Sequence, residues 1–78
     1  MLTAAQIRAA RALVGWSQPA LAKVSGVSLP TIVRMESAVG PGRSSAANVD
    51  AVRRALETAG VFFLEGDDGP GVRLKPNS

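Results

Sequence analysis

A single glycine, Gly26, separates two short segments whose apolar residues recur at helical spacing. Ala22 lies four residues before this glycine, and Ile32 lies six residues after it. A small side chain lets two helices cross closely, and a glycine accepts the positive φ that a tight turn between them requires. The spacing therefore predicts two helices, at about 18–25 and 29–37, joined by a turn at Gly26.

Hydroxyl and proline residues mark where these two helices begin. Ser17 and Ser28 each directly precede a helix, where a hydroxyl oxygen can accept a backbone N–H that has no partner within the helix. Pro19 and Pro30 each follow two residues later, in the first turn, where a missing N–H costs little. Both helix starts are therefore specified locally.

The second of these helices has two different faces. Ile32 and Met35, three residues apart, place one face on the core. The opposite face is left for a partner and carries Leu29, Pro30, Val33 and Arg34. One possibility is that a helix pair of this kind is purely structural and binds no partner. Alternatively, its exposed face can bind in the major groove of duplex DNA.

Charge is distributed unevenly along the 78 residues. Residues 1–54 carry an excess of five basic groups, whereas residues 55–78 carry an excess of two acidic groups. A basic body suits contact with phosphate, although solvated surface arginines explain the same distribution. Cysteine and histidine are both absent. We therefore expect no disulfide, no metal site and no cofactor. No pair of catalytic groups stands in a plausible arrangement, so we expect no enzymatic activity, and no run of about 18 apolar residues predicts a membrane-spanning segment.

Two further helices are predicted on either side of this pair. Thr3 followed by Gln6 is a capping-box pattern, which predicts a helix at about 4–14. A Gly- and Pro-rich stretch after the helix pair predicts a loop. Ser45 is then expected to cap a fourth helix at about 46–59, which carries an apolar stripe along one face.

Residues 61–75 change character and predict short strands. Strand-forming residues at 61–64 are followed by turn residues and then by the alternating segment 72–74. Phe62 and Phe63 point to opposite sides of a strand, so one can enter the core and the other would be exposed in a monomer.

An isolated two-stranded hairpin is marginally stable in water, so we expect these strands to pair across a symmetric homodimer. The alternative is a hairpin folded back within one chain. The residues expected at the dimer contact are Val61, Phe62, Phe63, Leu64, Val72 and Leu74. Residues 76–78 are expected to form a flexible tail.

Taken together, these motifs resemble the phage-repressor-like (Cro, or XRE) family over about residues 3–60. The motifs that carry the resemblance are Trp16-Ser17-Gln18, Leu21-Ala22, Ser25-Gly26-Val27-Ser28, Thr31-Ile32 and Arg34-Met35-Glu36. The resemblance implies a mainly α fold, with a compact four-helix, lambda-repressor-like domain at 1–60 and a short C-terminal β-hairpin or β-strand extension. It implies a cytoplasmic, nucleoid-associated transcriptional regulator, most simply a dimeric repressor that reads an inverted repeat in double-stranded DNA.

The resemblance also implies roles for individual residues. Ser17 and Gln18 are expected at phosphate, Arg34 at a base edge, and Arg43 along the phosphate backbone. The full set expected at DNA is Ser17, Gln18, Ser28, Leu29, Pro30, Thr31, Val33, Arg34 and Arg43. Arg11 and Glu36 are expected to form a structural ion pair, the alternative being two solvated charges.

Two alternatives remain open. An antitoxin-like protein of the same fold would hold a toxin-like or other regulatory protein and use DNA binding for autoregulation. A weaker alternative is an interaction module without base readout, because Leu29 and Pro30 stand where relatives often carry residues that hydrogen-bond bases. Leu29 can still contact a thymine methyl group, and direct readout then depends on Arg34, whose guanidinium fits guanine O6 and N7.

Overall fold

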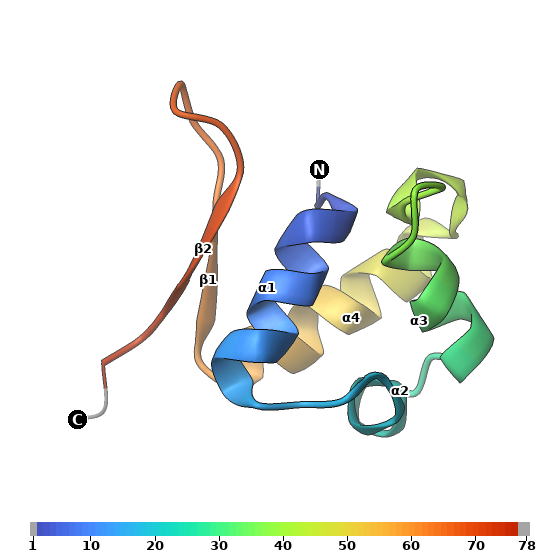
Figure 1. Ribbon diagram of the computed structural model, residues 1–78. Coiled ribbons are helices and arrows are strands. Elements are labelled where there is room, and N and C mark those ends of the chain that lie inside the picture. Colours follow the sequence, from blue (N-terminus) through green and yellow to red (C-terminus); the bar gives the residue numbers. More distant parts are fainter. Residues whose placement is uncertain (1, 77–78) are drawn as a thin grey trace.

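The computed structural model describes residues 2–76, and within that range the chain is mainly helical (Figure 1). Its elements are α1 (Ala4–Val14), α2 (Gln18–Ser25), α3 (Leu29–Met35), the 3₁₀ helix η1 (Pro41–Arg43), α4 (Ala46–Thr58), β1 (Val61–Leu64) and β2 (Gly71–Leu74). The predicted fold class, a helical domain with a short C-terminal hairpin, is confirmed. Residues 77 and 78 of the predicted flexible tail lie outside the described range.

Each α-helix begins at a hydroxyl residue whose side chain accepts a backbone N–H from the first turn. These caps are Thr3, Ser17, Ser28 and Ser45. Gly26 ends α2 at a φ of 75°, in the left-handed region that favours glycine. The turn between α2 and α3 therefore depends on Gly26, as the spacing predicts.

Two predicted helix ends are wrong by one or two residues. α3 ends at Met35 instead of residue 37, because the Ser37 N–H bonds to the Arg34 carbonyl three residues back and tightens the chain into a turn. α4 ends at Thr58 instead of residue 59, where the Gly60 N–H bonds to the Glu57 carbonyl in the same way.

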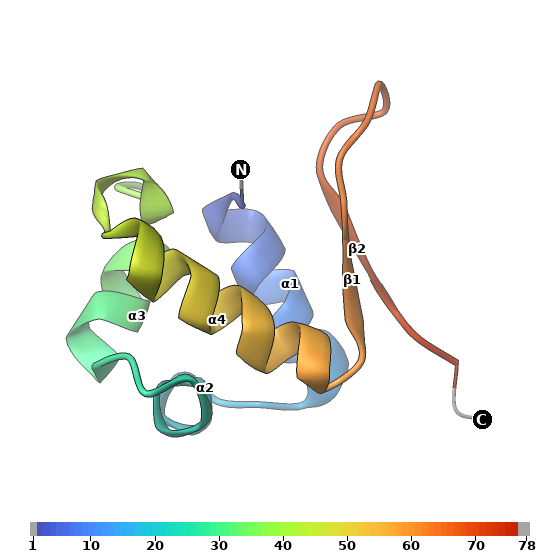
Figure 2. The same cartoon turned by 180° about the vertical axis from the view of Figure 1, so that it is seen from behind.

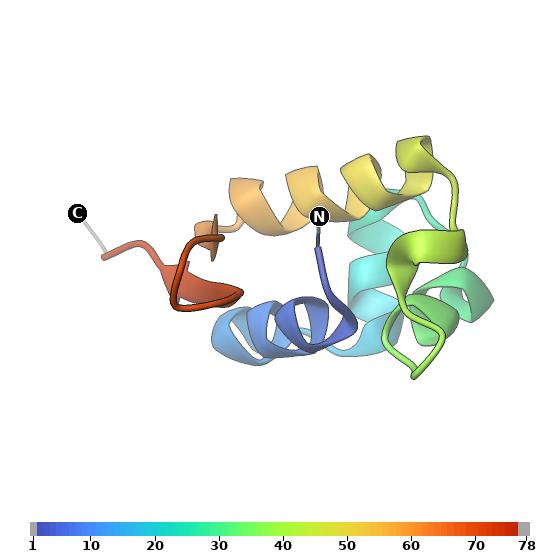
Figure 3. The ribbon, with the colours of Figure 1, turned by 90° about the horizontal axis from the view of Figure 1, so that it is seen from above.

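The core lies between α1, α2, α3 and α4. Its buried apolar side chains are Leu2, Ile7, Ala10, Leu21, Val27, Ile32, Met35, Val52, Ala55, Leu56 and Val61. In the views of Figures 2 and 3, α1 and α4 run beside each other, α3 lies at one end of the molecule and the hairpin lies at the other. The hairpin packs with β2 against α1 and β1 against α4. The hairpin and α3 therefore occupy opposite ends of the domain.

The two strands pair with each other in antiparallel orientation, with Val61 opposite Leu74 and Phe63 opposite Val72. Val61 is buried and Phe63 packs against the core, whereas Phe62 points outward and is 46% exposed. One phenylalanine therefore enters the core and the other does not, as expected. Pairing within the chain is the alternative that the sequence left open, and a dimer through the outer surface of the hairpin stays a prediction.

Candidate nucleic-acid interface

The inner and outer faces of α3 differ sharply in exposure. Ile32 and Met35 on the inner face are fully buried. On the outer face, Leu29 is 39% exposed and Val33 is 46% exposed, and Pro30 and Arg34 are also exposed. Because the inner face is fixed by the core, the outer face is presented to solvent as a defined surface.

Glu36, directly after α3, has a buried carboxylate that accepts two hydrogen bonds from the guanidinium of Arg11 on α1. Arg11 Nε lies 2.7 Å from Glu36 Oε2, and Arg11 Nη2 lies 2.8 Å from Oε1. Arg11 Nη1 donates to the Trp16 carbonyl at 2.9 Å. The structure therefore brings together the two residues that the family resemblance paired, in a planar two-point contact that fixes the angle between α1 and α3.

The environment of Arg11 keeps its guanidinium charged. The hydrogen bond to Glu36 raises the pKa of Arg11, burial lowers it, and the charge of the carboxylate raises it again, with a net increase above the ordinary value. Only 2% of the Glu36 side chain is exposed, against 20% for Arg11. Without Arg11, the Glu36 carboxylate would therefore be a buried charge with no counter-charge. Without Glu36, the Arg11 guanidinium would still be partly accessible to water.

A second arginine, which the sequence reasoning missed, also holds the end of α3. Arg8 Nη1 donates a hydrogen bond to the backbone carbonyl oxygen of Glu36. A cation at the C-terminal end of a helix is favourable because the last carbonyls carry partial negative charge. The available signal was the spacing of Arg8 and Arg11, which lie three residues apart on one face of α1.

The polar residues at the start of α2 and α3 are partly engaged within the chain. Gln18 Nε2 donates to Glu36 Oε1 at 3.3 Å, which ties this side chain to the ion pair. Ser17 Oγ accepts the Ala20 N–H at 3.1 Å. Ser28 Oγ accepts the Thr31 N–H at 3.4 Å and donates to Thr31 Oγ1 at 2.8 Å. Arg34 is thus the exposed charged group of α3.

The loop after α3 brings one more basic side chain toward the same end of the molecule. Arg43 is the last residue of η1, is exposed, and follows the buried residue Pro41. Because η1 packs against α3, Arg43 belongs to the end of the domain that carries the outer face of α3. The residues expected at DNA therefore lie on α2, α3 and η1 and at the N-caps of α2 and α3.

The opposite end of the domain is held by a side chain that the sequence analysis treated only as a helix cap. Gln6 is buried, and its Nε2 donates to the carbonyl oxygens of Leu64 and Gly71 at 3.1 and 3.0 Å. Its Oε1 accepts the Thr3 N–H at 2.9 Å. One amide therefore caps α1 and attaches both strands of the hairpin. The sequence signal for this contact was Gln6 itself. When its Oε1 accepts a hydrogen bond in the cap of α1, the two N–H groups of its amide can still donate elsewhere.

The six residues expected at a dimer contact divide into two groups. Val61, Phe63 and Val72 pack against the core of their own chain. The exposed residues are Phe62, Leu64 and Leu74, which are 46%, 39% and 41% exposed. The Lys75 ammonium lies 4.8 Å from the centre of the Phe62 ring, within range of a cation–π interaction.

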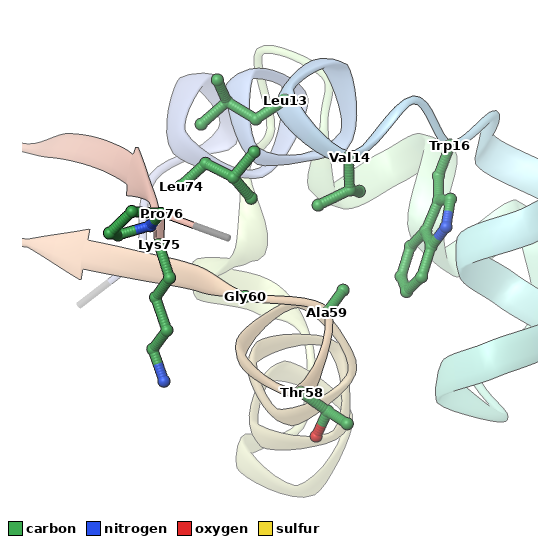
Figure 4. Close-up of a pocket in the computed structure, with 9 residues that line it drawn as sticks. All are labelled: Leu13, Val14, Trp16, Thr58, Ala59, Gly60, Leu74, Lys75 and Pro76. Carbon is green, nitrogen blue, oxygen red and sulfur yellow. The ribbon is translucent and has the colours of Figure 1, made fainter. Parts of the chain in front are cut away.

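A groove lies where the C-terminal ends of α1 and α4 meet the hairpin (Figure 4). Its lining residues are Leu13, Val14, Trp16, Thr58, Ala59, Gly60, Leu74, Lys75 and Pro76. Leu13, 42% exposed, and Leu74 face each other across one side of it. The exposed apolar side chains of the hairpin, Phe62, Leu64 and Leu74, lie next to this groove, at the end of the domain away from α3.

Neither a metal site nor a membrane span is found among residues 2–76. No group of three or more acidic side chains in that range is placed to hold a metal ion. No helix in it is both long enough and apolar enough to cross a bilayer.

Comparison with known proteins gives one finding that covers most of the helical domain. A family model described as helix-turn-helix matches residues 7–60, which is about two thirds of the chain. The match begins inside α1 and ends directly after α4, so it covers the whole outer face of α3 and leaves out the hairpin. A search of curated proteins gives no match.

Proposed function

The chain belongs to the helix-turn-helix family of Cro/C1 (XRE) type, and we propose that within this family of DNA-binding transcriptional regulators it acts as a small dimeric repressor. It would read an inverted repeat by placing α3 in the major groove and would repress by occupying the promoter. The observation that carries this proposal is the contrast between the two faces of α3. One face is locked to the core and to α1, and the other is exposed and bordered by arginine.

Arg34 is the residue proposed to read a base. Its guanidinium is exposed on the outer face of α3, and its two parallel donors match the O6 and N7 acceptors of guanine. Arg43 and Ser17 are proposed to contact phosphate, which positions the domain without reading sequence. Gln18 is proposed to orient the start of α2 through Glu36 and to meet phosphate with the N–H that Glu36 does not bind.

A dimer is proposed because one short recognition helix reads only a few base pairs, and paired half-sites lie about one helical turn apart. The proposed contact is the exposed part of the hairpin, Phe62, Leu64 and Leu74, at the end of the molecule away from α3. In sedimentation velocity, Phe62→Glu is expected to shift the chain to monomer. Val24→Glu is the matched control, since Val24 is 56% exposed on α2. A dimer that survives Phe62→Glu and Leu64→Glu would place the contact elsewhere.

The same exposed hairpin surface supports a second candidate function. An apolar surface far from the DNA-binding face could hold a different protein, as in an antitoxin-like regulator that binds DNA for autoregulation. Co-purification of a stable hetero-complex that Phe62→Glu abolishes would favour this candidate over the simple repressor.

The proposed function is tested by selecting bound sequences from a random duplex library at physiological salt. The proposal predicts an enriched inverted repeat, with half-sites separated by about one helical turn. Enrichment of a single half-site would contradict the dimer. Recovery of no motif would contradict sequence-specific regulation as a whole.

A further inference from the structure

We propose that α3 recognises thymine through a strip of exposed apolar side chains, and that Leu29 and Val33 are its specificity-determining residues. This inference rests on the proposed DNA-binding function and makes it more specific. It assigns the base-reading role beside Arg34 to contacts with methyl groups instead of hydrogen bonds. The strip consists of Leu29, Val33 and Pro30.

The geometry of α3 places the strip side by side on its outer face, with Arg34 next to it. At 3.6 residues per turn, the order around the outer face runs from Leu29 through Val33 and Pro30 to Arg34. Leu29 and Val33 are four residues apart and therefore adjacent on the surface. Three neighbouring positions of a helix that enters the major groove are thus unable to donate or accept a hydrogen bond.

The polar neighbours of the strip do not replace it. The Ser28 hydroxyl donates to Thr31 Oγ1 and also accepts the Thr31 N–H, so its proton is already used within the chain. Thr31 is half-buried beside the core face. Arg34 is the flanking polar group that remains extended into solvent. A base lying against Leu29 or Val33 is therefore met by carbon atoms.

Thymine supplies the matching chemistry. In the major groove thymine presents a C5-methyl group beside its O4 acceptor, whereas the other three bases present donors or acceptors and no methyl group. A donor or acceptor covered by Leu29 or Val33 loses its water without gaining a partner, which is unfavourable. Valine in a helix and proline are also conformationally stiff, so little side-chain entropy is lost on contact.

Duplex DNA is the occupant that the surroundings of this strip favour over a second protein. Arg34 borders the strip on α3 and the exposed Arg43 lies in η1, which packs against α3, so two positive charges accompany the apolar strip at this end of the domain. The strip also lies within the part of the chain that the helix-turn-helix family model covers. A polyanion with methyl groups in its groove matches both properties.

The test replaces each thymine of the selected duplex, one position at a time, by deoxyuridine, which removes only the methyl group. We expect about a fourfold loss of affinity at one or two positions in each half-site, the size expected for one methyl group withdrawn from an apolar contact. An unchanged affinity at every position would overturn the inference. Failure to select any motif would instead contradict the proposed DNA-binding function, so the two failures are distinguishable.

Protein variants then assign the methyl contacts. Leu29→Ala and Val33→Ala should each abolish the deoxyuridine penalty at one position and leave the others unchanged, which is a coupling that only direct contact produces. Leu13→Ala and Val24→Ala are the matched controls, since both side chains are exposed and lie outside α3. They should retain every penalty. A penalty that persists in both Leu29→Ala and Val33→Ala would overturn the inference and assign the effect to DNA shape.

Discussion

Helix α1 holds α3 at one end of the domain and the hairpin at the other, by different chemistry. Toward α3, Arg11 grips the buried carboxylate of Glu36 with two nitrogens. Toward the hairpin, Gln6 donates both protons of a neutral amide to the backbone carbonyls of Leu64 and Gly71. The first junction joins two charged side chains, whereas the second joins one side chain to the backbone.

The difference between the junctions has an energetic consequence. A buried ion pair contributes little compared with a well-packed apolar pair, yet losing one partner is costly because the other charge stays buried. A neutral hydrogen bond contributes about 0.5–1.5 kcal/mol, and losing it leaves carbonyls that water can reach more readily. Removing one partner of the Arg11–Glu36 ion pair, the α3 junction, should therefore cost much of the stability at once. Removing the Gln6 hydrogen bonds, the hairpin junction, should cost less.

The largest expected effect is that of Arg11→Ala, which leaves the Glu36 carboxylate buried without its counter-charge. We expect a loss of about 3–5 kcal/mol in the free energy of unfolding, measured by urea denaturation. Glu36→Ala should cost less, because Arg11 is partly exposed and can turn to water. If Glu36→Ala were the more destabilising of the two, the asymmetry argued from burial would be wrong.

A smaller effect is expected from Gln6→Ala, which removes two hydrogen bonds to the hairpin and one within the α1 cap. The cost should be about 1–3 kcal/mol. By hydrogen exchange, amides of β1 and β2 should exchange faster while those of α3 do not. Gln18→Ala is the matched control and should leave hairpin exchange unchanged. Equal acceleration across the whole domain would show that Gln6 does not act on the hairpin in particular.

The smallest effect on stability is expected at the ion pair between Arg54 and Asp50. Like the α3 junction it joins an arginine to a carboxylate, but it is exposed to solvent. Arg54 Nε lies 2.9 Å from Asp50 Oδ2 on α4, with 77% of the Arg54 side chain and 49% of the Asp50 side chain exposed. Arg54→Ala should change the free energy of unfolding by less than about 1 kcal/mol, and less still at high salt. A cost comparable to that of Arg11→Ala would show that burial is not what makes the α3 junction strong.

The same comparison explains what could be predicted from the sequence. Local signals sufficed for the helix starts, because a hydroxyl cap or a left-handed glycine acts within a few residues of itself. The pairing of Arg11 with Glu36 was available only through the family resemblance. The bonds from Gln6 and Arg8 end at distant backbone carbonyls, so the sequence offered signals for the two donor side chains but none for their acceptors.

The ends of α3 and α4 were harder to predict for a related reason. Ser37 and Gly60 each bond to a carbonyl three residues back, and many sequences allow either this turn or one more residue of helix. The strand pairing was also undecided, because alternating residues fit a hairpin and a dimer edge equally well. Packing of Phe63 and Val72 on the core and the Gln6 contacts favour the hairpin in the folded chain.

The proposal that the outer face of α3 reads DNA, while its inner face holds the helix in place, predicts a selective effect of Arg34→Ala. Affinity is measured for the selected duplex and for random duplex at the same salt concentration. We expect a loss of about 1–3 kcal/mol on the selected duplex, a much smaller loss on random duplex, and an unchanged free energy of unfolding. Equal losses on both duplexes would contradict base reading by Arg34 and reduce its role to phosphate contact.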